Sequence, residues 1–266
     1  MINPDNFIKA IKNNKLNFIT GVPDSLLKNL TNRINNNFKK HIISTNEGSA
    51  VSFAIGHYLS SKKPGIVYLQ NSGLGNIINP IASLAHPKVY GIPMILIIGW
   101  RGEIKGTRQI LDEPQHKKQG EITIKQLKIL NIPFKIINQN TKNLFGLINK
   151  IVKISIEKQT PVAIVVRKNT FKNLNKKDFK KKREFLREDV IKEILGVSNT
   201  KNIIISTTGM ASRELYEIRK KNKQSTLMDF LTIGGMGHAS QIASGIAMNI
   251  KDKKIICIDG DGSLLM

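Results

Sequence analysis

The sequence has 266 residues, of which 40% are hydrophobic and 23% charged. This composition supports a sizeable core and argues against wholesale disorder, and the length predicts two domains or one large one. The single cysteine, Cys257, excludes an intramolecular disulfide and a cysteine-cluster zinc site, and its apolar neighbours predict a small buried side chain. A signal-peptide profile and a bilayer-length apolar stretch are both absent from the sequence, so we expect a cytoplasmic protein without membrane contact.

The net charge of +23 raises the question of nucleic-acid binding. Most of the basic residues are lysines, whereas readers of nucleic acids commonly use arginine for bidentate contacts and aromatic residues for stacking. Only the segment 168–187 concentrates basic residues, and it predicts a solvated linker. A basic nucleic-acid-binding protein stays open as an alternative from another class, but we expect no nucleic-acid partner.

Short β-branched segments alternate with amphipathic stretches before the linker, which is typical of parallel α/β layers. The strands are near-continuous apolar runs, as expected when both faces of a sheet are covered. The expected strands are residues 18–20, 42–44, 66–69, 94–98, 134–137 and 162–166. The expected helices are residues 25–35, 49–60, 122–130 and 143–157. Residues 1–169 therefore predict a doubly wound parallel sheet of about six strands.

The same alternation restarts after the linker. The expected helices are residues 187–195, 212–221 and 240–249, and the expected strands are residues 203–206, 227–230 and 255–258. Residues 188–266 therefore predict an incomplete second doubly wound sheet, with the domain boundary inside the linker.

The turns that follow the strands hold the candidate site residues, because ligands in open α/β sheets bind at the carboxyl ends of strands. Residues 207–209 (Thr-Thr-Gly) place hydroxyls and free N–H groups before a helix, which is a ready anion site. Residues 259–263 follow the next apolar strand with two carboxylates and a hydroxyl. Together the two turns predict a diphosphate held through Mg²⁺, which prefers carboxylates, phosphate oxygens and water. The alternative is a pair of ordinary glycine loops.

Several of these segments resemble those of thiamine-diphosphate-dependent enzymes. Residues 260–263 resemble the opening of the thiamine-diphosphate motif, residues 234–238 the turn that supports the bent cofactor, and residues 45–50 the activating-glutamate segment. Four more segments are similar to those of phosphonopyruvate decarboxylases, with sulfopyruvate decarboxylases as the nearest relatives: residues 20–27, 70–76, 98–103 and 112–116. The resemblance extends from about residue 18 to the last residue.

The resemblance implies a pyrimidine-binding domain (1–169), a basic linker (170–187) and a partial diphosphate-binding domain (188–266). It also implies a carboxy-lyase of phosphonate biosynthesis that converts 3-phosphonopyruvate to phosphonoacetaldehyde and CO₂ with thiamine diphosphate and Mg²⁺. The cofactor is needed because no side chain supplies an electron sink for decarboxylation. A sulfopyruvate decarboxylase is the alternative within the class.

The resemblance also assigns roles to individual residues. Glu47 would share a proton with the aminopyrimidine ring, although a glutamate in the first turn of a helix is also favoured by the helix dipole alone. Asp24 and His116 are candidates for proton transfer after CO₂ leaves, and Asp24 has an alternative role as a helix cap. The implied substrate contacts are Ser25, Arg101 and Lys118. The implied cofactor contacts are Gly73, Thr208, Gly209, Ser212, Gly234, Met236, Gly262 and Ser263, with Asp261 as the metal ligand. Gly73 could also be an ordinary turn residue, and Met236 a filler of core gaps.

The resemblance implies a homodimer or larger homo-oligomer, because the glutamate and the diphosphate site of this superfamily come from different subunits. The segment between Arg101 and His116 is a few residues longer than is usual in the family. The sequence ends five residues after Asp261, whereas the motif normally continues to asparagines, one of which ligates Mg²⁺. We therefore expect a C-terminally truncated chain, either a fragment of an active decarboxylase or an inactive homologue.

Overall fold

The computed structural model describes residues 1–174, 185–198 and 202–266. The chain divides into two compact units, Met1–Lys177 and Asp178–Met266. Most of the predicted basic linker, residues 175–184, lies outside the described residues. Among the described helices, none combines the length and the apolar character needed to cross a membrane.

The first unit is built on a six-stranded sheet with the order β2-β1-β3-β4-β8-β7. Every neighbouring pair is parallel, which confirms the parallel α/β fold predicted from the apolar runs. The strands are β1 (Phe18–Gly21), β2 (Lys40–Ile43), β3 (Gly65–Gln70), β4 (Met94–Gly99), β7 (Phe134–Ile137) and β8 (Pro161–Val166).

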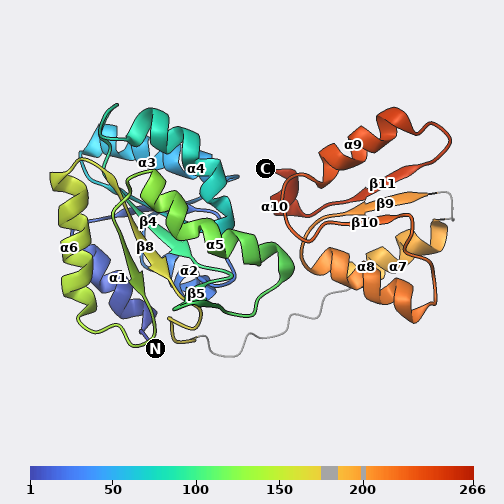
Figure 1. Cartoon of the computed structure of the whole chain (residues 1–266), viewed down its shortest axis with the longest axis horizontal. Helices are drawn as coiled ribbons and strands as arrows, with labels where there is room; N and C mark the ends of the chain where they lie inside the picture. Colours follow the sequence, from blue (N-terminus) through green and yellow to red (C-terminus); the bar gives the residue numbers. More distant parts are fainter. Residues whose placement is uncertain (175–184, 199–201) are drawn as a thin grey trace. The chain divides into compact units, whose positions relative to one another are not determined.

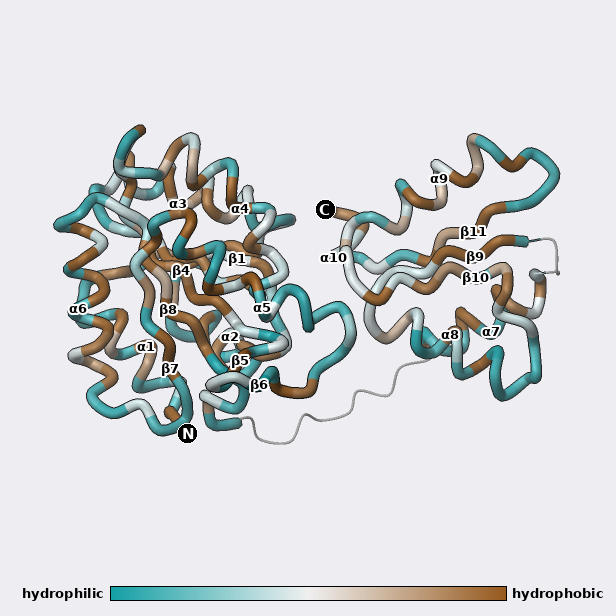
Figure 2. Tube along the Cα trace, viewed as in Figure 1, coloured by the Kyte–Doolittle hydropathy of each residue, from teal (hydrophilic) through white to brown (hydrophobic). Residues whose placement is uncertain are grey.

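Helices cover both faces of this sheet (Figure 1). One face packs against α1 (Pro4–Asn13), α2 (Lys28–Ile34) and α6 (Leu144–Glu157). The other packs against α3 (Glu47–Ser61), α4 (Leu74–Pro80), a π-helical turn (Ile81–Ala85) and α5 (Pro114–Ile129). Along β3, Ile66 and Tyr68 enter the first core and Val67 and Leu69 the second, so the strand is apolar throughout. Figure 2 shows this hydrophobic interior along the central strands.

Three helices of the first unit differ most from the expectation, and one of them, α4, has no counterpart among the expected helices. Helix α1 was not predicted, although Asn3 caps it (Asp5 N to Asn3 Oδ1, 2.8 Å) and Pro4 occupies its first turn. Helix α5 begins at Pro114, eight residues before its predicted start, because its first two turns are polar and carry no apolar periodicity. A short antiparallel hairpin, β5 (Ile104–Lys105) and β6 (Arg108–Gln109), lies between β4 and α5 in the chain.

The second unit contains a three-stranded parallel sheet with the order β10-β9-β11. Its strands are β9 (Ile203–Ser206), β10 (Asp229–Leu231) and β11 (Ile255–Ile258). One face packs against α7 (Arg187–Val197) and α8 (Met210–Lys221), and the other against α9 (Ala239–Asn249). A four-residue helix, α10 (Asp261–Leu264), follows β11.

Cys257 is exposed, so the prediction of a buried thiol was wrong. The residue lies on β11, which is an edge strand of the described three-stranded sheet. An apolar run in an edge strand is less completely covered than the same run in a central strand, and the sequence pattern does not distinguish the two.

The strand order reverses beside β1 in the first unit and beside β9 in the second. From β1 the chain moves to β2 on one side and then to β3 on the other, and from β9 it moves to β10 and then to β11. In an open α/β sheet, the crevice at such a reversal is where ligands bind. The turns after β1 and β3, and those after β9 and β11, are therefore where site residues should lie.

Candidate active site

Glu47 is the first residue of α3, and the residue as a whole is buried at 6% exposure. Its Oε2 accepts a hydrogen bond from Asn76 Nδ2 at 2.7 Å. Gly73 lies directly against the same carboxylate, since a Cβ built on Gly73 would come 2.3 Å from Glu47 Oε1. The carboxylate of Glu47 therefore occupies space that any side chain at position 73 would fill. The contact with Asn76 was not predicted from the sequence.

Asp24 follows β1 and is buried at 5% exposure. Its Oδ1 accepts the N–H of Leu26 at 3.2 Å, whereas α2 begins only at Lys28, so Asp24 does not cap that helix. Its Oδ2 has no hydrogen-bond partner within the described residues and lies against Gly99 at the end of β4. Burial raises the pKa of Asp24 to about 6, against the lowering by the Leu26 N–H and the charge of Arg101. Near neutral pH this carboxyl can therefore both hold and release a proton.

Arg101 follows β4, and its guanidinium is hydrogen-bonded to Asp112 and Ser25. Its Nε and Nη2 donate to the two carboxylate oxygens of Asp112 at 2.9 and 2.6 Å, and its Nη1 donates to Ser25 Oγ at 3.2 Å. The structure thus brings Asp24, Ser25 and Arg101 together at the carboxyl ends of β1 and β4. The bidentate partner Asp112 belongs to the segment 112–116 that carries part of the resemblance, but the sequence reasoning assigned it no role at the site.

His116 lies in the first turns of α5 and is buried at 8% exposure. Its Nε2 is 3.6 Å from Glu113 Oε2, and its Nδ1 has no hydrogen-bond partner among the described residues. Burial lowers the pKa of His116, and the charge of Arg101 lowers it further against the opposing effect of Asp112. The imidazole is therefore held in its neutral form, with a buried nitrogen available to a ligand.

Lys118 does not join this group of residues. Its side chain is 80% exposed, and its Nζ donates to Glu121 Oε2 at 3.2 Å. Two residues along a helix correspond to a rotation of about 200°, so Lys118 lies on the opposite side of α5 from the buried His116. The structure provides no support for its predicted contact with a substrate.

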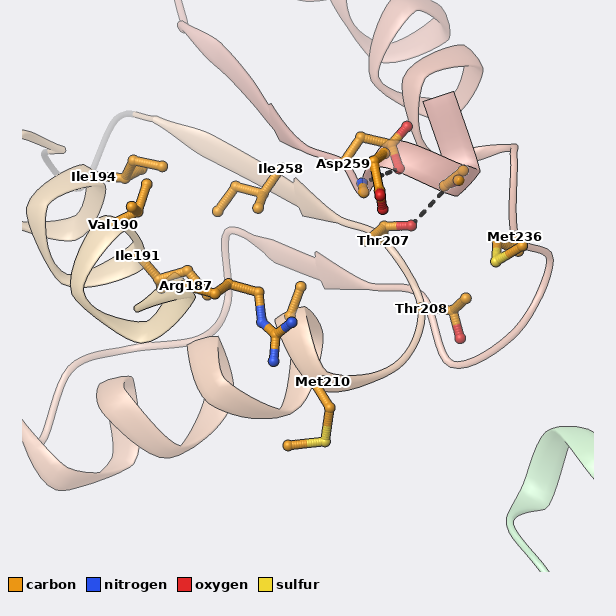
Figure 3. A pocket seen from close by; sticks show the side chains of 15 residues that line it. Arg187, Val190, Ile191, Ile194, Thr207, Thr208, Met210, Met236, Ile258 and Asp259 are labelled. Atoms are coloured by element: carbon orange, nitrogen blue, oxygen red, sulfur yellow. Dashed lines mark hydrogen bonds between the residues drawn. The ribbon is translucent and has the colours of Figure 1, made fainter. Parts of the chain in front are cut away.

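The second unit has a pocket of about 390 Å³ at the ends of β9 and β11. Thr207 and Asp259 lie next to each other there, with Arg187 on one side and Met236 on the other (Figure 3). Thr207 Oγ1 donates to the buried Ser263 Oγ at 3.1 Å, and that oxygen also accepts the N–H of Gly237 at 2.9 Å. Burial favours a higher pKa for Asp259, but the hydroxyls of Ser263 and Thr207 and the N–H of Gly260 outweigh it and lower the pKa. Asp259 is therefore a stable anion.

Helix α8 begins at this pocket. Gly209 precedes it with φ +93°, a left-handed conformation that favours glycine, and Thr208 and Met210 line the pocket on either side. The hydroxyl of Ser212 donates to the carbonyl oxygens of Thr207 (2.7 Å) and Ser206 (3.2 Å). Ser212 thus holds the turn in shape, which leaves its hydroxyl less available for a phosphate than the sequence reasoning assumed.

Met236 is 40% exposed and lines the pocket, so it does not fill a gap in the core. It belongs to the turn that precedes α9, in which Gly235 and Gly237 have φ values of +65° and +93°. Gly234 lies in the same turn but does not line the pocket. All four residues of the predicted motif line the pocket: Gly260, Asp261, Gly262 and Ser263.

These groups fit a diphosphate and a divalent cation. Hydroxyls, the N-terminus of the 12-residue helix α8 and an apolar methionine surround the pocket, with Asp259 and Asp261 at its edge. Within the described residues, no three His, Cys, Asp or Glu side chains are grouped so that they could hold a metal. Mg²⁺ requires only one or two carboxylates where phosphate oxygens and water complete its shell, so the donor set is compatible with it.

Two family models match the chain. One, for the N-terminal TPP binding domain of thiamine pyrophosphate enzymes, matches residues 4–128, and the other, for their C-terminal TPP binding domain, matches residues 207–266. The two matched ranges contain the site residues of the first and the second unit respectively.

Among curated relatives, the phosphonopyruvate decarboxylase of Streptomyces viridochromogenes is 29% identical over 265 residues, which cover 93% of this chain and 64% of the relative. The sulfopyruvate decarboxylase subunit alpha of Methanococcus maripaludis is 35% identical over 161 residues, or 59% of this chain and 90% of the relative. The subunit beta from Methanocaldococcus jannaschii is 44% identical over 80 residues, or 30% of this chain and 39% of the relative. The chain thus spans slightly less than two thirds of the length of the Streptomyces relative.

Proposed function

The chain belongs to the family of thiamine pyrophosphate enzymes, and we propose that it serves the decarboxylation of 3-phosphonopyruvate to phosphonoacetaldehyde and CO₂. The observation that carries the proposal is the grouping at the edge of the first sheet. There, a half-buried arginine reaches a serine hydroxyl beside a buried carboxyl whose pKa is raised to about 6. A small acid with a second anionic group needs such a cation and such a proton carrier.

The reaction breaks the bond between the carboxylate carbon and the keto carbon, and a proton from the protein replaces CO₂ on that carbon. Thiamine diphosphate, when bound, supplies the electron sink that holds the electron pair left by CO₂. Asp24 is a suitable proton donor because about half of it is protonated near pH 6 and its Oδ2 lacks a partner among the described residues. His116 offers a second buried position at which a proton can be accepted.

Glu47 prepares the cofactor in this proposal. Its carboxylate is buried between Gly73 and Asn76, so it can share a proton with a ring nitrogen without competition from bulk water. The pocket of the second unit would hold the diphosphate through Thr208, the N–H groups at the start of α8 and Gly262, and Asp261, which also lines it, would be a ligand of Mg²⁺. Ser263 supports this pocket through its hydrogen bonds to Thr207 and Gly237.

Arg101 and Ser25 hold the phosphonate in this proposal, since a guanidinium and a hydroxyl are favourable donors to its oxygens. Sulfopyruvate is the second candidate substrate, favoured by the sulfopyruvate decarboxylase subunits among the relatives. Its sulfonate has the same number of oxygens but carries one charge, whereas a phosphonate can carry two.

The experiment that tests the proposal measures CO₂ release from 3-phosphonopyruvate and from 3-sulfopyruvate by the purified protein with thiamine diphosphate and Mg²⁺. We expect faster turnover of the phosphonate, and turnover of neither substrate when the cofactor is omitted. A strong preference for the sulfonate would replace the proposed substrate, and cofactor-independent CO₂ release would overturn the proposed chemistry.

The proposal extends to a homo-oligomer. Two relatives that match different lengths of this chain are named as alpha and beta subunits, so related sequences work as assemblies. Light scattering on the eluting protein tests this part of the proposal. We expect a mass of at least two chains, and a monomer at working concentration would contradict it.

A further inference from the structure

Asp112 has an unusually complete set of hydrogen-bond donors around its carboxylate. Four donors surround its carboxylate: Nε and Nη2 of Arg101 at 2.9 and 2.6 Å, the N–H of Gly102 at 2.9 Å and the N–H of Glu113 at 2.9 Å. Two of these donors belong to one guanidinium, and the other two belong to the backbone on either side of the β5–β6 hairpin. A single carboxylate therefore fixes both the arginine side chain and the chain segments next to it.

The backbone of Arg101 is fixed separately. Asn71, which is fully buried, accepts the N–H of Arg101 at 3.0 Å and donates to its carbonyl oxygen at 2.9 Å. Asn71 thus holds the backbone of Arg101 in place, and Asp112 holds its guanidinium. With Nε and Nη2 engaged by Asp112, Nη1 is directed at Ser25 Oγ, 3.2 Å away. This leaves one edge of the guanidinium for a ligand.

We infer that Asp112 is a positioning residue, which holds Arg101 as the docking point for the anionic head group of the substrate. The inference rests on the proposed function, because that proposal supplies the anionic head group. A bidentate pair keeps the guanidinium plane fixed without a ligand, so binding costs less side-chain entropy than it would with a free arginine. The hydrogen bonds from Arg101 hold the pKa of Asp112 down at about 2, so the carboxylate stays charged over the working pH range.

A matched control exists elsewhere in the first unit. Asp5 forms the same kind of bidentate pair with Arg33, with Nε to Oδ1 at 2.9 Å and Nη2 to Oδ2 at 3.1 Å. That pair joins α1 to α2, and neither residue belongs to the candidate site. Asp5→Asn therefore removes a pair of similar geometry without touching Arg101.

The test titrates 3-phosphonopropionate, which has the phosphonate but cannot be decarboxylated as a 2-oxo acid, into the protein by calorimetry, with propionate as the reference. We expect Asp112→Asn to weaken binding of the phosphonate by at least about tenfold and binding of propionate much less. Asp5→Asn should leave both affinities within about twofold, because the Asp5–Arg33 pair joins α1 to α2 and makes no contact with Arg101. In the background of Arg101→Lys, the further change Asp112→Asn should have little effect on phosphonate affinity. The guanidinium that Asp112 positions is already absent from that variant.

A second readout is independent of any ligand. The Nε–H proton of Arg101 should give a slowly exchanging signal in the NMR spectrum of the protein, and Asp112→Asn should abolish it while Asp5→Asn leaves it in place. If Asp112→Asn does not fold, Asp112→Glu replaces it in the test. This variant keeps the negative charge but displaces the guanidinium of Arg101, so we expect a smaller loss of phosphonate affinity.

Failure of the positioning role of Asp112 can be distinguished from failure of the proposed substrate. If the unaltered protein binds 3-phosphonopropionate no better than propionate, the head-group site fails, and both the proposed substrate and the inference fail with it. If the unaltered protein selects the phosphonate, but Asp112→Asn retains this selectivity and the Arg101 signal, then only the positioning role of Asp112 is overturned.

Discussion

The two sheets carry different kinds of residues at the carboxyl ends of their strands, although the strand order reverses in the same way in both. At the ends of β1 and β4, and at the start of α3, the first unit buries carboxyl groups and places Arg101 nearby. At the ends of β9 and β11, the second unit gathers hydroxyls, positive-φ glycines and the N-terminus of α8 around a pocket. The first edge is suited to moving protons, because burial raises the pKa of Asp24 to about 6, and the second is suited to holding an anion with neutral donors.

This contrast shows that a fold supplies a place for a site while the residues in the turns decide its task. In the first unit, Asp24 is buried without a partner for Oδ2 among the described residues, an arrangement that lowers stability but suits proton transfer. In the second, the hydroxyls of Thr207, Ser212 and Ser263 are hydrogen-bonded to each other or to backbone, so the pocket is already shaped before a ligand arrives. Substitutions at the first edge should therefore change turnover and the pH dependence of stability, and substitutions at the second should change cofactor affinity.

Among the glycine variants, the largest effect is expected at Gly73. In Gly73→Ala, the new Cβ would stand 2.3 Å from Glu47 Oε1, so the carboxylate must move. We expect decarboxylation to fall by at least about a hundredfold, since a displacement of about 1 Å in a catalytic group has that effect. The matched control is Gly75→Ala, two residues later, where a Cβ meets nothing within 4 Å. Equal activity of the two variants would show that the position of Glu47 is unimportant.

The next effect concerns stability, and it has a definite sign. The pKa of Asp24 rises from 3.8 to about 6 on folding, so the proton on Asp24 stabilises the fold fully below pH 3.8. That contribution is lost as the pH rises through about 6. Asp24→Asn should therefore become more stable relative to the unaltered protein as the pH rises from about 4 to 8, by up to about 3 kcal/mol.

Urea unfolding of the first unit at several pH values measures this gain. Asp5→Asn is the control, because that carboxylate is paired with Arg33 and its removal should not stabilise the protein at high pH. A stability difference between Asp24→Asn and the unaltered protein that stays constant from pH 4 to 8 would contradict the assignment of a buried charge at Asp24.

A smaller effect is expected at the edge of the second sheet. Gly209 has φ +93° before α8, and alanine in this conformation is strained by about 1–3 kcal/mol. Gly209→Ala should relieve the strain by turning the N–H groups at the start of α8 away from the pocket, and the affinity for thiamine diphosphate should fall by about tenfold. Gly245→Ala on α9, where a Cβ meets nothing within 4 Å, should bind the cofactor as the unaltered protein does. Calorimetric titration with thiamine diphosphate and Mg²⁺ decides between these outcomes.

Much of this architecture could be predicted from the sequence where local pattern and burial agree. The run at residues 94–98 became a central strand with no side chain above 1% exposure, because an uninterrupted apolar run suits a sheet covered on both faces. The turns after β9 and β11 were found because glycine and hydroxyl residues between an apolar strand and a helix are typical of anion-binding turns.

The rest depended on contacts that sequence spacing does not encode. Asp112 reaches Arg101 across a hairpin of two-residue strands, and no local periodicity signals such a pair. Gly73 was expected to let the backbone approach a cofactor, but the structure shows that it also makes room for a glutamate 26 residues earlier in the chain. His116 lay outside the expected helix 122–130, because the polar start of α5 hides the turns that carry this residue.

The most direct test of the division of labour between the two edges compares Glu47→Gln with the unaltered protein in two assays. Glutamine can still accept the hydrogen bond from Asn76, but it cannot share a proton as a carboxylate does. The account predicts that decarboxylation falls by about 10²–10⁴ while the affinity for thiamine diphosphate, measured by calorimetry, changes only a few-fold. Unchanged turnover in Glu47→Gln would contradict it.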